Sequence, residues 1–298
     1  MRDFIKINRK ADIALNIVMI LCTIACVLPL LIVFSASITD EKTVTMYGYS
    51  LFPRNLSLEA YKYIYKDIMV ILRAYGVTVF VTVVGSALSL VTIALYAYPI
   101  SRKDFKYRNV FTFIVFLTML FNGGLVPWYM VYVNVLHIDD TIMALILPYL
   151  MTPLYVLIMR TFFMTTIPDG IIEAARIDGA GEFQTFVWIV LPLAKPVLAT
   201  IGLFNILTYW NDWYAPLLFI NNEKLFNLQY LMYRVDKAII YLSNNAGSIN
   251  NATQIMANLP SQTARMAMAV VAIGPIILAY PFFQKYFVEG LTIGSIKG

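Results

Sequence analysis

The sequence predicts an all-α integral membrane protein with six transmembrane helices and no soluble domain. Its 298 residues are 60% hydrophobic and only 13% charged, and the mean hydropathy is +0.73. Soluble globular proteins, by contrast, carry roughly 25% charged residues. The apolar residues also gather in uncharged runs long enough to cross a bilayer, which takes about 20 helical residues. These two properties together predict a bundle of membrane-spanning helices.

The first span is expected directly after a basic N-terminal tail. Residues 1–11 carry four basic side chains, and residues 13–39 then contain no charged residue. A run of this length exceeds the apolar core of a signal peptide, which has about 7–15 residues, so it predicts an uncleaved helix. Residues 35–72 are mixed in polarity and rich in tyrosine, which indicates an external loop with short amphipathic helices.

Five further apolar runs complete the predicted bundle. Residues 109–138 contain the pair Gly123-Gly124 and Pro127, which should break this span or turn it back into the membrane. The glycine pair is therefore a possible hinge. The other four runs each predict one span, at residues 74–101, 141–159, 195–216 and 266–287.

The distribution of basic residues indicates the orientation of the spans. If both termini face the cytoplasm, the inside segments hold 13 Lys and Arg in 69 residues, and the outside segments hold 9 in 97. Because basic residues favour the cytoplasmic side of a membrane, both termini are expected there. The same orientation puts the polar segment between the fourth and fifth spans in the cytoplasm.

This polar segment, residues 166–192, predicts a helix, a turn and a second helix. Thr166 and Asp169 have the spacing of a capping box at the start of the first helix. Gly179 falls where a left-handed C-terminal cap is expected, and Pro192 should end the second helix.

A helical wheel gives the first of these helices an apolar side and a charged side. The apolar side should pack against the protein, and the charged side should meet a partner. The apolar set is Ile171, Ala174 and Ala175, and the opposite set is Glu173 and Arg176.

The inventory of charged and reactive residues disfavours several classes of function. The net charge of +5 comes from short clusters beside the apolar runs, which is typical of topology signals and not of nucleic-acid binding. Cys22, Cys26 and the single His137 form neither a metal site nor a disulfide framework, so both cysteines should pack as small apolar groups. The chain has no G-x-x-x-x-G-K-S/T phosphate loop, so it should not itself hydrolyse ATP.

The spacing within residues 166–192 resembles that of a known family. It matches without a gap the EAA signature of the permease subunits of bacterial ABC importers, which here is Glu173-Ala174-Ala175, three residues, Gly179, nine residues, Ile189, one residue and Leu191-Pro192. The resemblance covers roughly residues 70–290. It implies the MetI-like fold of an ABC type I importer permease, in which this segment is the cytoplasmic EAA coupling helix.

Further phrases resemble the maltose-type, carbohydrate-uptake permeases of this family. These phrases are IMRTFF at 158–163, EAARIDGAG at 173–181, KPVLATIGLF at 195–204 and WNDW at 210–213. FNGGLVP at 121–127 is similar to the branch associated with complex oligosaccharides. The resemblance implies a tail, first helix and external loop at 1–72, a permease transmembrane domain at 73–287, and a cytoplasmic tail at 288–298.

The resemblance also implies what the segment does. In such importers the EAA loop lies in a groove of a cytoplasmic ATPase subunit, and movements of that groove tilt the membrane helices. Carried over to this chain, Glu173 would face a donor on the ATPase, Ala174 and Ala175 would permit close approach, and Gly179 would make the turn. The last three residues of the set would connect this lever to the fifth span. The ATPase-coupling set is Glu173, Ala174, Ala175, Arg176, Asp178, Gly179, Ile189, Leu191 and Pro192.

Partners and cofactors follow from the same resemblance. A second permease subunit would pair with this chain as a pseudo-twofold heterodimer, two copies of the ATPase would bind it, and an extracellular solute-binding protein would dock on the loops at 35–72 and 217–265. The chain itself would hold no cofactor, because ATP and Mg bind to the partner ATPase. The implied function is a non-catalytic carbohydrate permease, for an oligosaccharide, in the bacterial plasma membrane. A secondary transporter or a non-transporting membrane scaffold stays as the alternative, and the sugar is open.

Asp212 is the one acid within an apolar span. It lies in a cluster with Tyr209, Trp210, Asn211 and Trp213, about 25 Å along the helix from the cytoplasmic edge and thus near the outer interface. Two alternatives stay open for this cluster. It is an interfacial aromatic belt with a structurally paired acid, or it lines the substrate path and its rings stack on sugar rings.

Overall fold

The structure is a computed structural model that describes residues 9–244 and 262–275. In these two ranges the regular elements are helices, and one isolated bridge joins Thr39 to Leu56. The contacts divide the chain into two compact units. The described residues of one unit are 9–68, 234–244 and 262–275, and those of the other are 69–233.

The first unit contains the long helix α1 and the short helices of the predicted external loop. Its elements are α1 (Arg9–Ser37), α2 (Glu41–Tyr47), α3 (Glu59–Lys66), the second half of α14 (Leu228–Asn244) and a helix at 262–275. The Asp40 side chain caps α2 by accepting from the Thr43 N–H at 3.3 Å. The Glu41 carboxylate accepts from the Gln262 and Thr263 N–H groups, both at 2.9 Å, and so ties α2 to the start of the last helix. The predicted short helices in this loop are confirmed.

Helix α1 covers the predicted first span as one continuous helix. Residues Ala11–Ser37 are long and apolar enough to cross a membrane, and none of the most apolar stretch is buried within the chain. Cys22 and Cys26 lie on this stretch as exposed free thiols, and their packing as small apolar groups stays a prediction.

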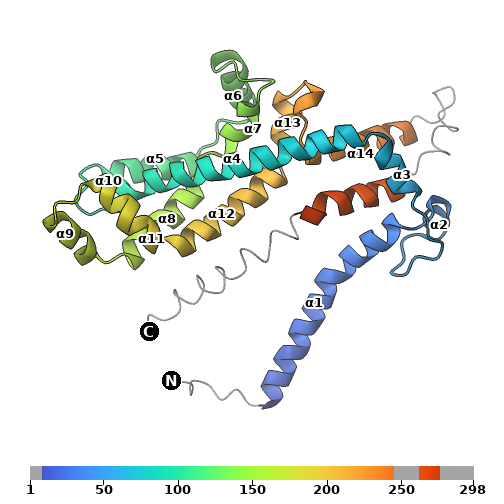
Figure 1. Cartoon of the computed structure of the whole chain (residues 1–298), viewed down its shortest axis with the longest axis horizontal. Coiled ribbons are helices and arrows are strands. Elements are labelled where there is room, and N and C mark those ends of the chain that lie inside the picture. Colours follow the sequence, from blue (N-terminus) through green and yellow to red (C-terminus); the bar gives the residue numbers. More distant parts are fainter. Residues whose placement is uncertain (1–8, 245–261, 276–298) are drawn as a thin grey trace. The chain divides into compact units, whose positions relative to one another are not determined.

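The second unit is a bundle around the long helix α4 (Figure 1). Figure 1 shows α9, α10 and α11 gathered at the C-terminal end of α4, and α6, α7 and α13 on another side of the unit. The elements are α4 (Ile68–Ser101), α5 (Arg108–Leu120), α6 (Leu125–Met130), η1 (Val131–Val135), α7 (Ile142–Ile146), η2 (Leu147–Tyr149), α8 (Pro153–Thr166), α9 (Asp169–Ile177), α10 (Glu182–Thr185), η3 (Phe186–Val190), α11 (Leu191–Leu193), α12 (Lys195–Trp210), α13 (Tyr214–Phe219), η4 (Glu223–Leu225) and the first half of α14.

Two apolar cores hold this bundle together. The first joins α4 to α8, α9, η3 and α12, and its fully buried members include Ala97, Met159, Val190 and Ile201. The second gathers α7, α13 and the outer parts of α4 and α12 around Phe219. The first core supports the 166–192 segment, and the second surrounds the cluster near Asp212.

Only part of the predicted span pattern appears as unbroken helices. Ala11–Ser37 and Ile68–Ser101 are each long and apolar enough to cross a membrane, and three bent helix pairs raise the number to five among the described residues. The predicted sixth span, 266–287, extends beyond the described residues, so the number six stays a prediction. The predicted runs 141–159 and 195–216 are both interrupted, by a bend of 49° before α8 and by a turn after Trp210.

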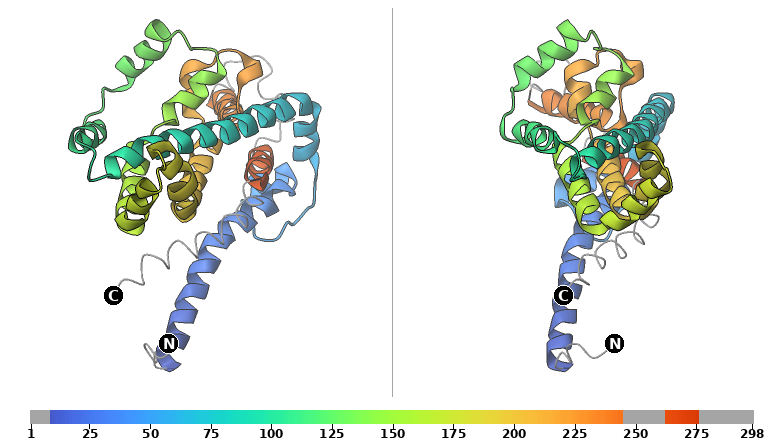
Figure 2. Two further views of the ribbon diagram at one scale, coloured as in Figure 1. Left: turned by 60° about the vertical axis from the view of Figure 1, so that its left-hand side comes forward. Right: turned by 90° about the vertical axis from the view of Figure 1, so that its left-hand side faces the viewer.

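The expected break at Gly123-Gly124 is confirmed. Arg108–Leu120 and Leu125–Val135 are bent by 116° relative to each other, and Gly124 has a left-handed φ of 86°. Figure 2 shows an extended stretch between these two halves, which point in different directions. A residue with a Cβ would be strained at this φ, so glycine suits the break.

Close packing between α4 and α12 depends on two glycines, Gly85 of α4 and Gly202 of α12. A Cβ built on Gly85 would lie 2.7 Å from the Tyr209 ring, and one built on Gly202 would lie 3.3 Å from Leu90. Both contacts agree with the roles that small residues have between membrane helices. At Gly76 of α4, by contrast, no heavy atom lies within 4 Å of the Cβ position.

Gly85→Val is expected to destabilise the protein. The Tyr209 ring cannot easily move away, because it is 1% exposed and donates a hydrogen bond to the Ile146 carbonyl at 2.8 Å. Overpacking of this kind costs about 1–3 kcal/mol. Thermal melting of the detergent-solubilised protein measures the effect, and Gly76→Val is the matched control on the same helix. Equal melting temperatures for the two variants would contradict this packing.

Candidate functional site: the 166–192 segment

Helix α9 packs through a different face from the one that the wheel predicts. Ile172 and Ala175 are buried, at 1% and 6% exposure, whereas Ile171 is 41% exposed and Ala174 is also exposed. The prediction for Ile171 and Ala174 is therefore wrong, and that for Ala175 is confirmed. Ile172 shows which face of α9 is buried, because it lies in the core between α4, α8 and η3.

The outer face of α9 combines small residues with one acid and one large apolar side chain. Gly170, Glu173, Ala174 and Ile177 are all exposed and share this face by helical spacing. Ile177 is 86% exposed. A surface with so little side-chain bulk lets another backbone approach closely, while Glu173 offers a carboxylate to a donor.

The turn after α9 has the geometry of a Schellman cap. Gly179 has φ of 84°, its N–H donates to the Arg176 carbonyl at 3.0 Å, and the Ala180 N–H donates to the Ala175 carbonyl at 2.9 Å. The predicted left-handed cap is confirmed. The predicted capping box is wrong, because Thr166 is the last residue of α8 and α9 begins after Pro168 without a side-chain cap.

Gly179→Val should loosen this turn, whereas Gly179→Asn should preserve it. A left-handed conformation costs an ordinary residue roughly 1–2 kcal/mol, and asparagine tolerates it better than a β-branched residue does. Hydrogen–deuterium exchange at the amides of Gly179 and Ala180 reads out the two bonds that close the turn. Equal protection in the two variants would show that the left-handed conformation does not hold the turn.

The second half of the segment leads into α12 through a packed corner. Phe186 and Val190 are buried, Ile189 and Leu191 are half-buried, and Pro192 is exposed. The helical conformation continues through Pro192 to Leu193, one residue beyond the predicted end. Glu182–Leu193 and Lys195–Trp210 then meet at 80°.

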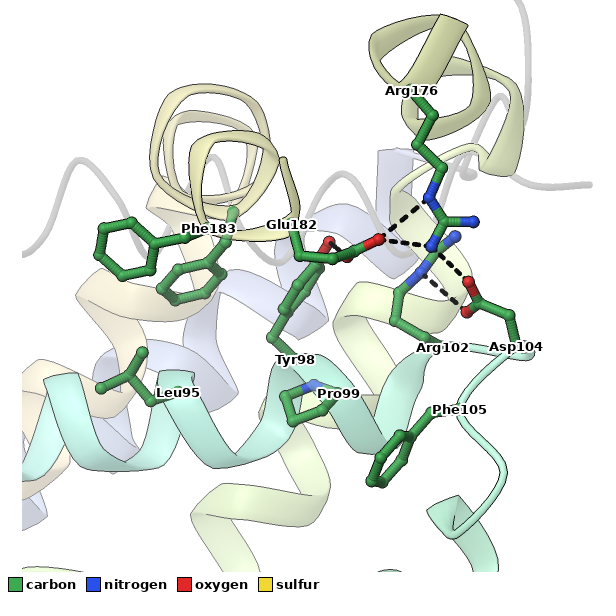
Figure 3. A pocket seen from close by; sticks show the side chains of 10 residues that line it. Leu95, Tyr98, Pro99, Arg102, Asp104, Phe105, Arg176, Glu182 and Phe183 are labelled. Atoms are coloured by element: carbon green, nitrogen blue, oxygen red, sulfur yellow. Dashed lines mark hydrogen bonds and ion pairs between the residues drawn. The ribbon is translucent and has the colours of Figure 1, made fainter. Parts of the chain in front are cut away.

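Six charged residues tie α9 to the end of α4, and we call this group the clasp. At one end of α9, Lys103 Nζ lies 2.8 Å and Arg102 Nη1 lies 3.5 Å from the Asp169 carboxylate. At the other end, Arg176 binds the Asp104 carboxylate and, at 2.6 Å, Glu182 (Figure 3). The clasp consists of Arg102, Lys103, Asp104, Asp169, Arg176 and Glu182.

Two acids of the clasp, Asp104 and Asp169, are held in their charged form. The hydrogen bond from Lys103 lowers the pKa of the Asp169 carboxyl, and the hydrogen bond from Arg176 lowers the pKa of the Asp104 carboxyl. Both pKa values thus lie below the ordinary range. The stabilisation from these pairs is present above the ordinary carboxyl pKa and is lost as pH falls through the lowered values, so both carboxylates are charged at neutral pH.

A pocket of about 440 Å³ lies beside the clasp. Figure 3 shows Leu95, Tyr98 and Pro99 of α4 on one side of it, Phe183 and Glu182 of α10 on the other, and Arg102, Asp104 and Arg176 at one end. The Tyr98 hydroxyl donates to Glu182 at 3.1 Å. Phe183, which lines the pocket, is 70% exposed.

The cluster near Asp212 is mostly interior. Asp212 is 8% exposed, and its Oδ1 accepts from the Tyr149 hydroxyl at 2.9 Å and from the Tyr214 and Ala215 N–H groups at 2.9 and 3.1 Å. Tyr209 and Trp210 are buried, at 1% and 6% exposure, so they do not form an exposed aromatic belt. The exposed members of the predicted set are Asn211 and Trp213. These contacts favour the alternative in which Asp212 is a structurally paired acid.

Two groups of site residues could not be predicted from the sequence. In the clasp, Asp104 binds Arg176, which lies 72 positions later in the sequence, and Glu182 binds Arg176 across the turn after α9. Tyr149, which donates to Asp212, lies 63 positions before it. The only sequence signal was charge: Asp104 follows two basic residues in a stretch that also serves as a topology signal.

Comparison with known proteins gives consistent matches over the chain. Residues 91–293 match the family described as "Binding-protein-dependent transport system inner membrane component". The chain is 38% identical over 272 residues to "Protein LplC" of Bacillus subtilis (strain 168), with 91% of this chain and 90% of that protein covered. It is 37% identical over 291 residues to the "Polygalacturonan/rhamnogalacturonan transport system permease protein YtcP" of the same organism, with 98% and 99% covered.

A solved structure shares the fold. It is described as "Crystal structure of a bacterial ABC transporter involved in the import of the acidic polysaccharide alginate", and its matching chain has 27% sequence identity and a TM-score of 0.79. The match covers 96% of this chain and 100% of that chain.

Proposed function

The chain belongs to the family of binding-protein-dependent transport system inner membrane components, and we propose that it carries an oligosaccharide through an ATP-driven importer. Members of this family are permease subunits of ABC importers in the bacterial plasma membrane, and ATP is hydrolysed by separate subunits. One similar protein is named for polygalacturonan and rhamnogalacturonan transport, and the similar structure belongs to an alginate importer. These names support a carbohydrate substrate.

The observation that carries the proposal is the exposed face of α9 on a segment that continues into α12. Glu173 and Ala174 would contact the ATPase subunit, and the nearby Asp178 and Gly179 are exposed as well. Ala175 would act differently from its neighbour, because it is buried and lets α9 lie close to the core. The packed corner at Ile189, Leu191 and Pro192 would pass the movement to α12, since a rigid helical element transmits a shift of its end.

The assembly would contain this chain, a second permease subunit, two copies of the ATPase and an extracellular solute-binding protein. ATP and Mg would bind to the ATPase, and both termini of this chain would lie in the cytoplasm. The loops at 35–72 and 217–265 would receive the solute-binding protein. Helix α1, whose apolar surface is exposed in this chain, would face lipid and the second permease subunit.

Two further roles belong to the proposal. Asn211 and Trp213 are the accessible members of the predicted substrate path, so sugar contact would fall to them, with Tyr209, Trp210 and Asp212 supporting them from the interior. The Gly123-Gly124 break would be a hinge, because the helix direction changes by 116° there.

Affinity purification and uptake test the proposed function together. The tagged chain should co-purify with an ATPase and a second permease, and a strain without the chain should lose uptake of one member of a panel of labelled oligosaccharides, with galacturonan, rhamnogalacturonan and alginate fragments included. ATP depletion should stop that uptake. Purification without an ATPase, or unchanged uptake of every oligosaccharide in the panel, would overturn the proposal.

A further inference from the structure

Helix α9 is bound at both ends by one short stretch of chain. Asp169 and Arg176 are seven residues apart, which is about two helical turns, so they lie on the same side of α9. Both reach the stretch that directly follows α4, where Arg102 and Lys103 bind Asp169, and Asp104 binds Arg176. The position of α9 along this stretch is therefore defined at two points.

The clasp lies at the edge of the packed core, where four of its six side chains line a pocket. The pocket of about 440 Å³ separates the start of α10 from α4, and Phe183 leaves that space open to solvent. Deeper in the protein, Phe186 packs on Tyr98 with ring centroids 5.0 Å apart, and Ile172 and Ala175 hold the inner face of α9. Close packing thus holds the inner side of this region, and the charge pairs of the clasp lie at the pocket beside it.

We propose that the clasp is a second path for coupling, in which Arg176 is a positioning residue that makes α9 and the end of α4 move as one body. The inference rests on the proposed function, because it concerns how a displacement of α9 by the ATPase reaches the membrane helices. The path through Leu191 and Pro192 leads to α12. The clasp leads instead to α4, the long helix around which the unit is built (Figure 3).

Arg176 is placed to hold α9 to the end of α4 and not to contact the ATPase. Its guanidinium turns back to two acids, Asp104 before α5 and Glu182 on α10, so a single side chain joins three elements. Its relative side-chain exposure is 40%, and those of Asp104 and Glu182 are 46% and 57%. Exposed pairs contribute little to stability, so the expected consequence of breaking them is a change in coupling and not unfolding.

The test uses the complete transporter in proteoliposomes with its solute-binding protein and the oligosaccharide that the uptake panel identifies. The variants are Arg176→Gln, Asp104→Asn, the double variant, and Asp169→Asn at the other end of α9. Lys106→Gln is the matched control, because Lys106 is in the same stretch and lies over the Tyr107 ring, outside the clasp. The measurement is the number of ATP molecules hydrolysed for each oligosaccharide imported, with assembly checked by gel filtration.

Each single clasp variant should raise this ratio by about two- to fivefold, the size expected when an exposed charge pair is lost. The double variant should be no worse than Arg176→Gln alone, since both changes break the same link, and Lys106→Gln should match the unmodified complex. The proposed role of the clasp would be overturned if the single variants leave the ratio of ATP hydrolysed to oligosaccharide imported unchanged. It would also be overturned if the two single effects multiply in the double variant. An unmodified complex that neither imports nor hydrolyses ATP would instead overturn the proposed function.

Discussion

Glu173→Lys is expected to reduce ATP-driven uptake by about tenfold or more while the chain still reaches the membrane. Glu173 is exposed on the outer face of α9, where small neighbours let a partner approach closely. Reversing a charge at such a contact puts like charges together, which costs enough to reduce binding by at least one order of magnitude. Uptake of the labelled oligosaccharide and the amount of chain in the membrane fraction are the two measurements.

Two controls separate the lost contact from a general defect. Glu173→Gln keeps the size of the side chain and removes only its charge, so it should retain more uptake than Glu173→Lys. The ATPase should co-purify less with Glu173→Lys than with the unmodified chain. Normal uptake by Glu173→Lys would show that this face of α9 is not the one that receives the ATPase.

Asp212→Ala is expected to have the largest effect on stability in the chain. One carboxylate oxygen serves three donors, the Tyr149 hydroxyl and the N–H groups of Tyr214 and Ala215. Alanine leaves all three donors, one buried and two part-buried, without this acceptor, and each buried unsatisfied group costs about 1–3 kcal/mol. The melting temperature and yield of the assembled complex should fall together.

Asp212→Asn distinguishes a structural acid from one that contacts substrate. The amide oxygen of asparagine can still accept from the same donors, so the complex should assemble and import its solute. A stable Asp212→Asn complex without uptake would show that the charge itself acts in the substrate path. In that case the alternative favoured by the buried contacts of Asp212 would be wrong.

Features that depend on local sequence could be predicted well. The membrane class follows from composition, and the breaks at Gly124 and Gly179 follow from the backbone freedom of glycine, which each position uses at positive φ. The phase of α9 could not be predicted in this way. Ile171 and Ile172 are adjacent and chemically identical, so only the surrounding core determines which of them is buried.

Features that depend on remote pairing could not be predicted. Arg176 and Asp104 are 72 positions apart, and the charges of the stretch after α4 are equally explained by the orientation of the chain. The burial of Tyr209 has the same kind of origin, because it depends on the approach of α12 to Gly85 of α4. An aromatic residue near the end of an apolar run looks the same in sequence whether it faces lipid or a neighbouring helix.

The clasp determines which part of the chain can be exchanged with a relative. Its two halves are 66 to 72 positions apart, so the coupling element is discontinuous in sequence. A transplanted 166–192 segment would bring foreign residues at positions 169 and 176 to a stretch that carries Arg102, Lys103 and Asp104. Chimaeric permeases should therefore inherit residues 102–104 and 166–192 from the same parent.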